Sequence, residues 1–312
     1  MATPYATPRA RALGLELRAA RERRRLGVRE LARLLGMTPG FVTNWERGLR
    51  LPKPEDVGAV LAHCRVIGDD RRRIVEMARG AREQDWIDSG GEEAYLEWER
   101  TAEAVFGWEP EVVPRLLQTS AYAKAVQCGS LGAVASAAAS RASPVLPVPA
   151  SPELPESLES LESPLEPLVE SRLARCEAPE SGPRCVQVLG EAALRGRIGG
   201  PGVMAEQVRY LAALLSEGRV DLRVVPAGSR PDLARGFTIF DFADLPSIVH
   251  ERLLRESASS SSPARVAKYR EVAETLLALA MPKAAAQTLL TSVIRELSVP
   301  WGRMGGEGRG EG

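Results

Sequence analysis

The fold of the N-terminal part of this chain is decided by residues 17–52, LRAARERRRLGVRELARLLGMTPGFVTNWERGLRLP. Apolar residues recur there at i, i+3, i+4 and i+7, the spacing of one buried helical face, namely Val28, Leu31, Ala32 and Leu35. Gly36 follows directly and can adopt the positive φ of a tight turn without steric cost. The pattern predicts a short helix that ends in a turn at Gly36.

A second short helix is expected immediately after this turn. Thr38 can cap it with its hydroxyl, and Pro39 suits its first position. Val42 and Trp45 then face back toward the preceding helix, while Gly48 ends the second helix as a left-handed cap. Prolines at 52 and 54 separate it from a further helix expected over 55–64. This pairing of helices around a glycine turn is typical of DNA-reading helix-turn-helix motifs.

The stretch resembles the Xre, or lambda-repressor-like, family over residues 13–82. The resemblance is carried by the run Glu30-Leu31-Ala32, the turn at Gly36 and the ending Trp45-Glu46-Arg47-Gly48. It implies a five-helix domain whose second motif helix enters the major groove, and a homodimer that reads two half-sites on double-stranded DNA. The residues then facing the groove are Thr38, Pro39, Gly40, Thr43 and Asn44.

Base readout is expected from few side chains, because neither Pro39 nor Gly40 can hydrogen-bond a base through its side chain. Asn44 is the best candidate for a bidentate contact to adenine, and Thr43 can bond a base or touch a thymine methyl group. Family members often carry a phosphate-binding Gln where this chain has Val28. The expected phosphate contacts are instead cations around the motif, namely Arg29, Arg33, Arg47, Arg50 and Lys53.

Several residues near the motif have two interpretations. The resemblance pairs Glu46 with Arg21 as a structural contact, and a role of Glu46 at DNA is the alternative. The cluster at residues 23–25, three arginines, is either a solvated helix end or a phosphate contact. Trp45 is expected in the core, whereas Phe41 either packs or remains exposed.

Charge is distributed unevenly over the 312 residues, although 41 basic and 41 acidic residues balance overall. Residues 1–86 contain 18 Lys and Arg against 11 Asp and Glu, a net charge of +7, which leaves −7 in the remainder. The excess positive charge coincides with the expected DNA reader and would attract phosphates in a salt-dependent way. The remainder is not expected to bind nucleic acid.

Neither a membrane span nor a secretory leader is predicted, so a cytoplasmic, nucleoid-associated protein is expected. The four cysteines, Cys64, Cys128, Cys176 and Cys185, lack paired spacing, and the chain has only two histidines. No metal site and no cofactor are therefore expected. Buried thiols are the simplest interpretation of the cysteines, with redox sensing through Cys176 and Cys185 as the alternative.

A second core begins beyond residue 85, where aromatic residues concentrate. Tyr95, Trp98, Ala102 and Val105 follow helical spacing, residues 108–113 suggest a short extended segment, and a helix is expected over 120–127. The region resembles the effector part of actinobacterial Xre regulators of the WhiJ-like type. That resemblance is carried by Pro114, Leu116, Leu117, Gln118, Thr119, Tyr122 and Ala123, with Arg115 in place of the usual glycine. It makes Gln118, Thr119 and Tyr122 candidates for an effector pocket.

The C-terminal half alternates between the two kinds of secondary structure. Strands are expected over 185–189, 220–225, 236–242 and 247–251, and helices over 201–217, 265–280 and 284–297. The predicted fold class is α+β multidomain: a five-helix lambda-repressor-like domain, a helical segment and a mixed α/β domain. The expected domain bounds are 1–12 for a flexible N-terminus, 13–85, 86–128, 129–167, 168–300 and 301–312 for a Gly-rich tail. Residues 129–167, rich in Ala, Ser, Pro and Glu, are expected to be disordered, with a regulated tether as the alternative.

Enzymatic chemistry is not indicated. The glycine-rich stretch 199–202 lacks the order of a phosphate or dinucleotide loop, and His250 and Glu251, adjacent on a strand, point to opposite faces. The sequence therefore predicts a sequence-specific transcriptional regulator whose C-terminal domain senses a small ligand or a partner protein. The alternative is an antitoxin-like protein that binds a small partner, encoded nearby, and autoregulates its operon. A third hypothesis is an enzyme fused to a DNA reader.

Overall fold

The computed structural model describes residues 6–88, 92–126, 128, 184–218, 220–229, 235–253 and 256–298. Contacts divide the chain into two compact units. The first contains residues 1–108, 183–185 and 232–278, and the second contains residues 109–182, 186–231 and 279–312. The expected insertion at 129–167 and the tail at 301–312 lie outside the described residues. The fold class is α+β, as predicted: an N-terminal helical region is followed by mixed strands and helices.

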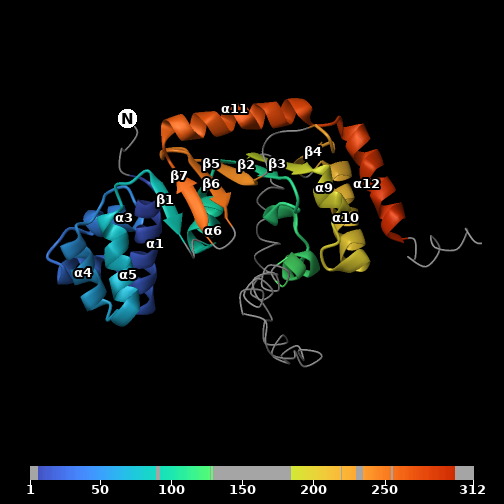
Figure 1. The fold of residues 1–312 in the computed structure, drawn as a ribbon. Coiled ribbons are helices and arrows are strands. Elements are labelled where there is room, and N and C mark those ends of the chain that lie inside the picture. The colour runs from blue at the N-terminus through green and yellow to red at the C-terminus, as the bar shows by residue number, and fades with distance from the viewer. Residues whose placement is uncertain are drawn as a thin grey trace, which may run out of the picture. The chain divides into compact units, whose positions relative to one another are not determined.

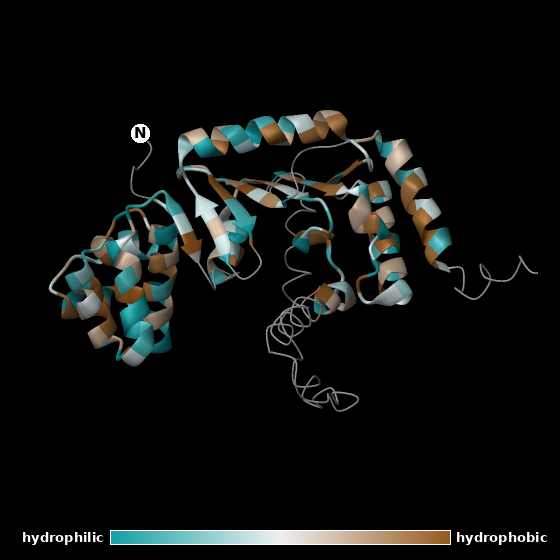
Figure 2. Ribbon diagram, viewed as in Figure 1, coloured by the Kyte–Doolittle hydropathy of each residue, from teal (hydrophilic) through white to brown (hydrophobic). Residues whose placement is uncertain are grey.

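The first unit starts with a bundle of five helices, coloured blue to cyan in Figure 1. These are α1 (Pro8–Arg23), α2 (Val28–Leu34), α3 (Pro39–Glu46), α4 (Pro54–His63) and α5 (Gly68–Arg79). Each is amphipathic, so hydrophilic and hydrophobic residues alternate along the helices in Figure 2. The buried residues at the centre of the bundle are Leu13, Leu17, Leu31, Trp45, Leu61 and Ile74.

The expected flexible N-terminus is wrong over residues 6–12. Helix α1 already begins at Pro8, and the Thr7 side chain caps it by accepting a hydrogen bond from the Ala10 amide at 3.1 Å. The Thr7 hydroxyl also donates to the carbonyl of Ala81 at 2.6 Å, beyond the end of α5. Thr7 therefore ties the start of α1 to the end of the bundle.

Five antiparallel strands follow the bundle within the first unit, in the order β1-β7-β6-β5-β2. Their bounds are β1 (Asp85–Asp88), β2 (Ala104–Glu109), β5 (Phe237–Asp241), β6 (Ile248–Arg252) and β7 (Ser257–Ser260). The chain passes from α5 into β1 within a few residues, and the Ser261 amide donates to the Gln84 carbonyl at 3.0 Å. The bundle is thus continuous with the edge of the sheet.

Helices cover both faces of these strands, as Figure 1 shows. On one face, α6 (Glu92–Thr101) packs the rings of Tyr95 and Trp98 against Phe240. On the other face, α11 (Pro263–Leu279) packs Tyr269 against Phe237 with ring centroids 4.9 Å apart. Phe237 and Phe240 lie on opposite faces because side chains alternate along a strand.

The aromatic helix predicted through Val105 is too long. Helix α6 ends at Thr101, and Val105 lies in β2, where it pairs with Phe240. The extended segment predicted over 108–113 consequently starts earlier, at Ala104. His250, on β6, is buried, and its Nδ1 lies 3.0 Å from the Ser259 hydroxyl.

The second unit contains a parallel pair of strands, β3 (Arg184–Gly190) and β4 (Asp221–Val225). They are joined through α9 (Glu191–Arg195) and α10 (Gly200–Glu217). Helix α12 (Lys283–Ser298) packs on α10. A short 3-10 helix, η1 (Arg115–Leu117), precedes a helical segment over 120–126.

Candidate nucleic-acid interface

The helix-turn-helix is formed by α2, the turn at Gly36 and α3. Gly36 has φ +65°, and the Met37 amide donates to the Ala32 carbonyl at 2.9 Å, which closes the turn. Leu31 and Ala32 from α2 and Val42 from α3 are almost completely buried. Helices α2 and α3 therefore pack through their apolar sides, and the opposite side of α3 faces solvent.

The outer face of α3 carries the expected base-reading residues. Thr38, Gly40 and Thr43 are exposed, and Asn44 is half-buried. An added Cβ at Gly40 would meet no atom within 4 Å, so the backbone there is open to a close approach. The Thr43 hydroxyl donates to the Pro39 carbonyl at 3.1 Å, which leaves its oxygen lone pairs available as acceptors.

Thr38 occupies the N-cap position of α3, but its side chain makes no capping hydrogen bond. The predicted hydroxyl cap is therefore wrong. Because the Thr38 hydroxyl is exposed and forms no capping hydrogen bond, it is available to a partner outside the chain.

The five cations expected at phosphates surround this face. Arg29, Arg33, Arg47, Arg50 and Lys53 are all exposed, and none forms an ion pair within the described part of the chain. The guanidinium carbon of Arg50 lies 4.3 Å from the centroid of the Phe41 ring, which restrains that arginine beside α3. Phe41 also meets Trp45 edge to face, with ring centroids 6.3 Å apart.

Arg21 and Glu46 meet at the base of the motif. Arg21 donates from Nε and Nη2 to the two carboxylate oxygens of Glu46, at 2.6 and 2.8 Å. It donates from Nη1 to the Leu26 carbonyl at 2.9 Å. The hydrogen bond from Glu46 raises the pKa of the Arg21 guanidinium above its ordinary value. The pair connects the end of α1 to the end of α3.

The candidate effector residues lie around η1 and form hydrogen bonds to neighbouring backbone and to α10. Gln118 and Tyr122 are buried, and both face the backbone of Val113: the Gln118 amide donates to its carbonyl at 2.7 Å, and the Tyr122 hydroxyl accepts from its amide at 3.1 Å. The Thr119 amide donates to Gln207 of α10 at 2.7 Å. These hydrogen bonds stabilise the chain around η1, and the assignment of the three residues to an effector pocket stays a prediction.

Three of the four cysteines are described. Cys64 and Cys185 are buried and Cys128 is exposed, these three form no disulfide with one another, and Cys176 lies outside the described residues. Burial raises the pKa of the Cys64 thiol. Across the described ranges, no group of three or more His, Cys, Asp or Glu side chains is placed to hold a metal ion.

Sequence reasoning missed Arg11 on α1. Its guanidinium is buried although no periodic pattern distinguishes it from the other arginines of the bundle. The residues that bury it include Phe242, which is far away in the sequence, so a local pattern could not identify it.

Comparison with known proteins finds two families, one over the helical bundle and one over most of the chain that follows it. A family described as Helix-turn-helix domain matches residues 12–74, and a family described as Domain of unknown function (DUF5753) matches residues 93–143 and 154–292. No curated protein and no solved structure matched. In the described part of the chain, no single helix is long and apolar enough to cross a membrane. Helices α11 and α12, which are bent against each other, reach that length and apolar composition only when they are taken together. The helix-turn-helix match supports a DNA-binding regulator.

Proposed function

The chain belongs to the DUF5753 family, and we propose that it is a transcriptional regulator that reads a specific DNA sequence through α3. The observation that carries the proposal is the surface around α3. An open, uncharged helical face is bordered by five exposed cations that lack carboxylate partners among the described residues. Phosphates would supply the missing anions, and base edges would meet the helical face.

The proposed readout divides the residues by role. Asn44 and Thr43 contact base edges, Thr38 adds its hydroxyl, and the backbone at Gly40 approaches the groove closely. The cations Arg29, Arg33, Arg47, Arg50 and Lys53 bind phosphates and set the register of the protein on the duplex. Because so few side chains reach the bases, the shape of the DNA contributes to specificity.

The finer interpretation is that of a WhiJ-like member of the Xre regulators, which acts as a homodimer on two half-sites. In this proposal the C-terminal part receives a signal, a small ligand or a partner protein, and changes the affinity for the operator. Such a change requires that the signal binds differently to the DNA-competent and DNA-incompetent arrangements.

The test is selection of binding sites from a random pool of duplex DNA by the purified full chain. We expect one enriched sequence with two related halves about one helical turn apart. The selected duplex and a scrambled duplex of equal length are then titrated by fluorescence anisotropy with wild type and with Asn44→Ala. Loss of a bidentate base contact should reduce the preference for the selected duplex by roughly 1–3 kcal/mol.

Two results would contradict the proposal. If the wild type does not bind any duplex at low ionic strength, the chain is not a DNA-binding regulator. If Asn44→Ala retains the full preference, Asn44 does not contribute to the readout. The circular dichroism spectrum of the variant should match wild type, because Asn44 lies on the outer face of α3.

A further inference from the structure

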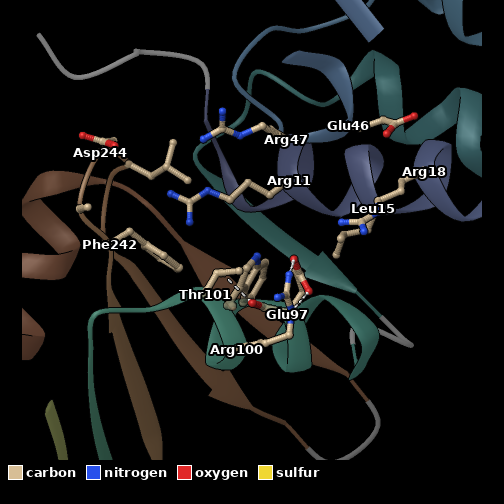
Figure 3. A pocket seen from close by; sticks show the side chains of 13 residues that line it. Arg11, Leu15, Arg18, Glu46, Arg47, Glu97, Arg100, Thr101, Phe242 and Asp244 are labelled. Atoms are coloured by element: carbon tan, nitrogen blue, oxygen red, sulfur yellow. Dashed lines mark hydrogen bonds and ion pairs between the residues drawn. The ribbon is translucent and has the colours of Figure 1, made fainter. Parts of the chain in front are cut away.

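A cavity of about 420 Å³ lies within the first unit, between the helical bundle and the sheet. Figure 3 shows its walls: α1 and the end of α3 on one side, and α6 with the chain that follows β5 on the other. No residue of this cavity was predicted from the sequence to bind an effector.

Arg11 is a buried cation whose hydrogen bonds are incomplete. Its side chain extends from α1 toward Phe242 (Figure 3), and the residue is only 6% exposed. Nη2 donates to the Pro246 carbonyl at 2.6 Å and Nε to the Ala6 carbonyl at 3.2 Å. Nη1 is buried without a hydrogen-bond partner in the described part of the chain, and no described carboxylate forms an ion pair with this residue. Buried arginines ordinarily pair with an anion.

Burial works against the charge of Arg11. Desolvation lowers the pKa of this guanidinium to about 9, which shows that its surroundings compensate the charge poorly. The face of the Phe242 ring attracts the positive charge of Arg11. The ring centroid lies 4.2 Å from the guanidinium carbon. An anion bound at Nη1 would supply the missing compensation.

The other charges around the cavity are mostly paired. Glu97 accepts a hydrogen bond from Arg100 at 2.7 Å, and Glu46 is occupied by Arg21. Asp244 is exposed and forms no ion pair within the described ranges. The charged side chains of the cavity wall that lack an ion pair among the described residues are Arg11, Arg47 and Asp244. The cavity therefore has an excess of about one positive charge.

The cavity also has apolar and hydrogen-bonding features that suit an organic molecule. Leu15, Trp98, Phe242 and Leu245 contribute to its walls. Trp98 is 2% exposed, and its indole Nε1 is buried without a described hydrogen-bond partner. A second donor without an acceptor thus belongs to the same lining as Arg11.

We propose that this cavity binds a small organic monoanion with a flat apolar body, such as an aromatic carboxylate, and that its binding weakens the affinity of the chain for DNA. The carboxylate accepts from Arg11 Nη1, which a small rotation of the side chain brings from its buried position into the cavity, and the body of the ligand packs on Phe242. The effect on DNA rests on the function proposed above.

The link to DNA runs through the contact between α1 and α3. A Cβ on Gly14 of α1 would come within 2.6 Å of the carbonyl oxygens of Trp45 and Glu46, and a Cβ on Gly48 within 2.8 Å of the Arg11 Cα. The backbone around Arg11 therefore touches the end of α3 directly. Arg47 belongs both to the cavity wall and to the proposed phosphate contacts, so a bound carboxylate attracts a cation that DNA also uses.

The first experiment measures ligand binding without DNA, by isothermal titration calorimetry with 1-naphthoate and with its uncharged counterpart 1-naphthamide. We expect 1-naphthoate to bind and 1-naphthamide to bind at least about tenfold more weakly. This difference in affinity corresponds to the loss of one charge-assisted hydrogen bond. Arg11→Met should lose about as much, whereas Arg18→Met, whose charge is already paired with Glu22 at 2.9 Å, should change the affinity by less than about threefold.

Asp244→Asn tests the same cavity without altering a buried residue. Removing the one unpaired carboxylate should tighten 1-naphthoate binding a few-fold, and this holds even if Arg11→Met fails to fold. Absence of 1-naphthoate binding to wild type, equal binding of the amide, or no response to Asp244→Asn would each overturn the proposed site.

The second experiment measures the affinity for the selected duplex in the presence of saturating 1-naphthoate. The expected result is weaker DNA binding for wild type and no change for Arg11→Met. If 1-naphthoate binds as predicted but leaves DNA affinity unchanged, the regulatory part of the inference is wrong. If the chain binds no DNA at all, the proposed function fails while the calorimetry still tests the anion site by itself.

Discussion

Replacement of Glu46 by alanine is the sharpest test of the helix-turn-helix architecture, because it leaves Arg21 buried without its principal partner. Removal of one partner of a buried ion pair typically costs about 3–5 kcal/mol. Arg21 retains its hydrogen bond to the Leu26 carbonyl and approaches Glu22 at 3.5 Å, but the Glu22 side chain is about half exposed. We therefore expect Glu46→Ala to lower the free energy of unfolding by about 2–3 kcal/mol.

The double variant Arg21→Met/Glu46→Leu removes both charges and replaces them with apolar side chains of similar size. Only the hydrogen bond to Leu26 is then lost without replacement, so the double variant should be destabilised by about 1 kcal/mol. Urea denaturation followed by far-ultraviolet circular dichroism measures all three free energies. A Glu46→Ala cost below about 0.5 kcal/mol, or a double variant as unstable as Glu46→Ala, would refute the buried-pair reasoning.

The same variants decide between the two interpretations of Glu46. If Glu46 serves only to hold α1 against α3, the double variant should bind the selected duplex as wild type does, measured by anisotropy where both proteins are folded. If Glu46 contacts DNA, the double variant should show the same change in DNA affinity as Glu46→Ala despite its recovered stability.

Three further predictions concern other parts of the chain. Arg47→Ala should weaken binding to all duplexes and reduce the slope of log affinity against log salt by about 0.9, whereas Arg79→Ala, which removes a cation already paired with a carboxylate on α5, should leave that slope unchanged in the same titration. Gly14→Ala should destabilise the bundle by about 1–3 kcal/mol in thermal or urea unfolding, because its Cβ would overlap the carbonyls at the end of α3; an unchanged stability would show that the helices separate freely. Gln207→Leu should cost about 1–3 kcal/mol in the same unfolding assay, since it leaves the Leu117 carbonyl and a neighbouring amide buried without partners, and a smaller loss would mean that water replaces the side chain.

The bundle was largely predictable because its signals are local. Pro39 and Gly48 mark the limits of α3, and the apolar spacing before Gly36 identifies α2. The base and phosphate roles of the surrounding residues remain predictions, because they rest on exposure and residue type alone.

The second core was less predictable, because apolar residues with helical spacing extend there from a helix into the strand that follows it. Trp98 and Val105 fit one helical face by spacing, yet the chain turns after Thr101 and Val105 pairs in β2. Strands β1 and β7 were missed because each is four residues long, and β7, Ser-Ala-Ser-Ser, lacks the β-branched and aromatic residues that indicate a strand.

The cavity could not be found from local sequence. Arg11 is buried through contacts with Phe242 and Pro246, which are more than 200 positions away and belong to the opposite end of the first unit in sequence. The motif around Gln118 shows the converse problem. A polar side chain next to an aromatic cluster can face either a ligand or its own backbone, and only the fold shows that Gln118 bonds Val113.

The direct passage from α5 into β1 has a consequence for protein engineering. A helix-turn-helix domain that is joined to the rest of its chain by a long linker can be exchanged between related proteins. In this chain, a cut near residue 85 would separate β1, the edge strand, from its partner β7. The shortened sheet would present unpaired amides and carbonyls, the kind of edge that promotes aggregation. Chimeras that are meant to change DNA specificity should therefore replace side chains on α3 within the intact polypeptide.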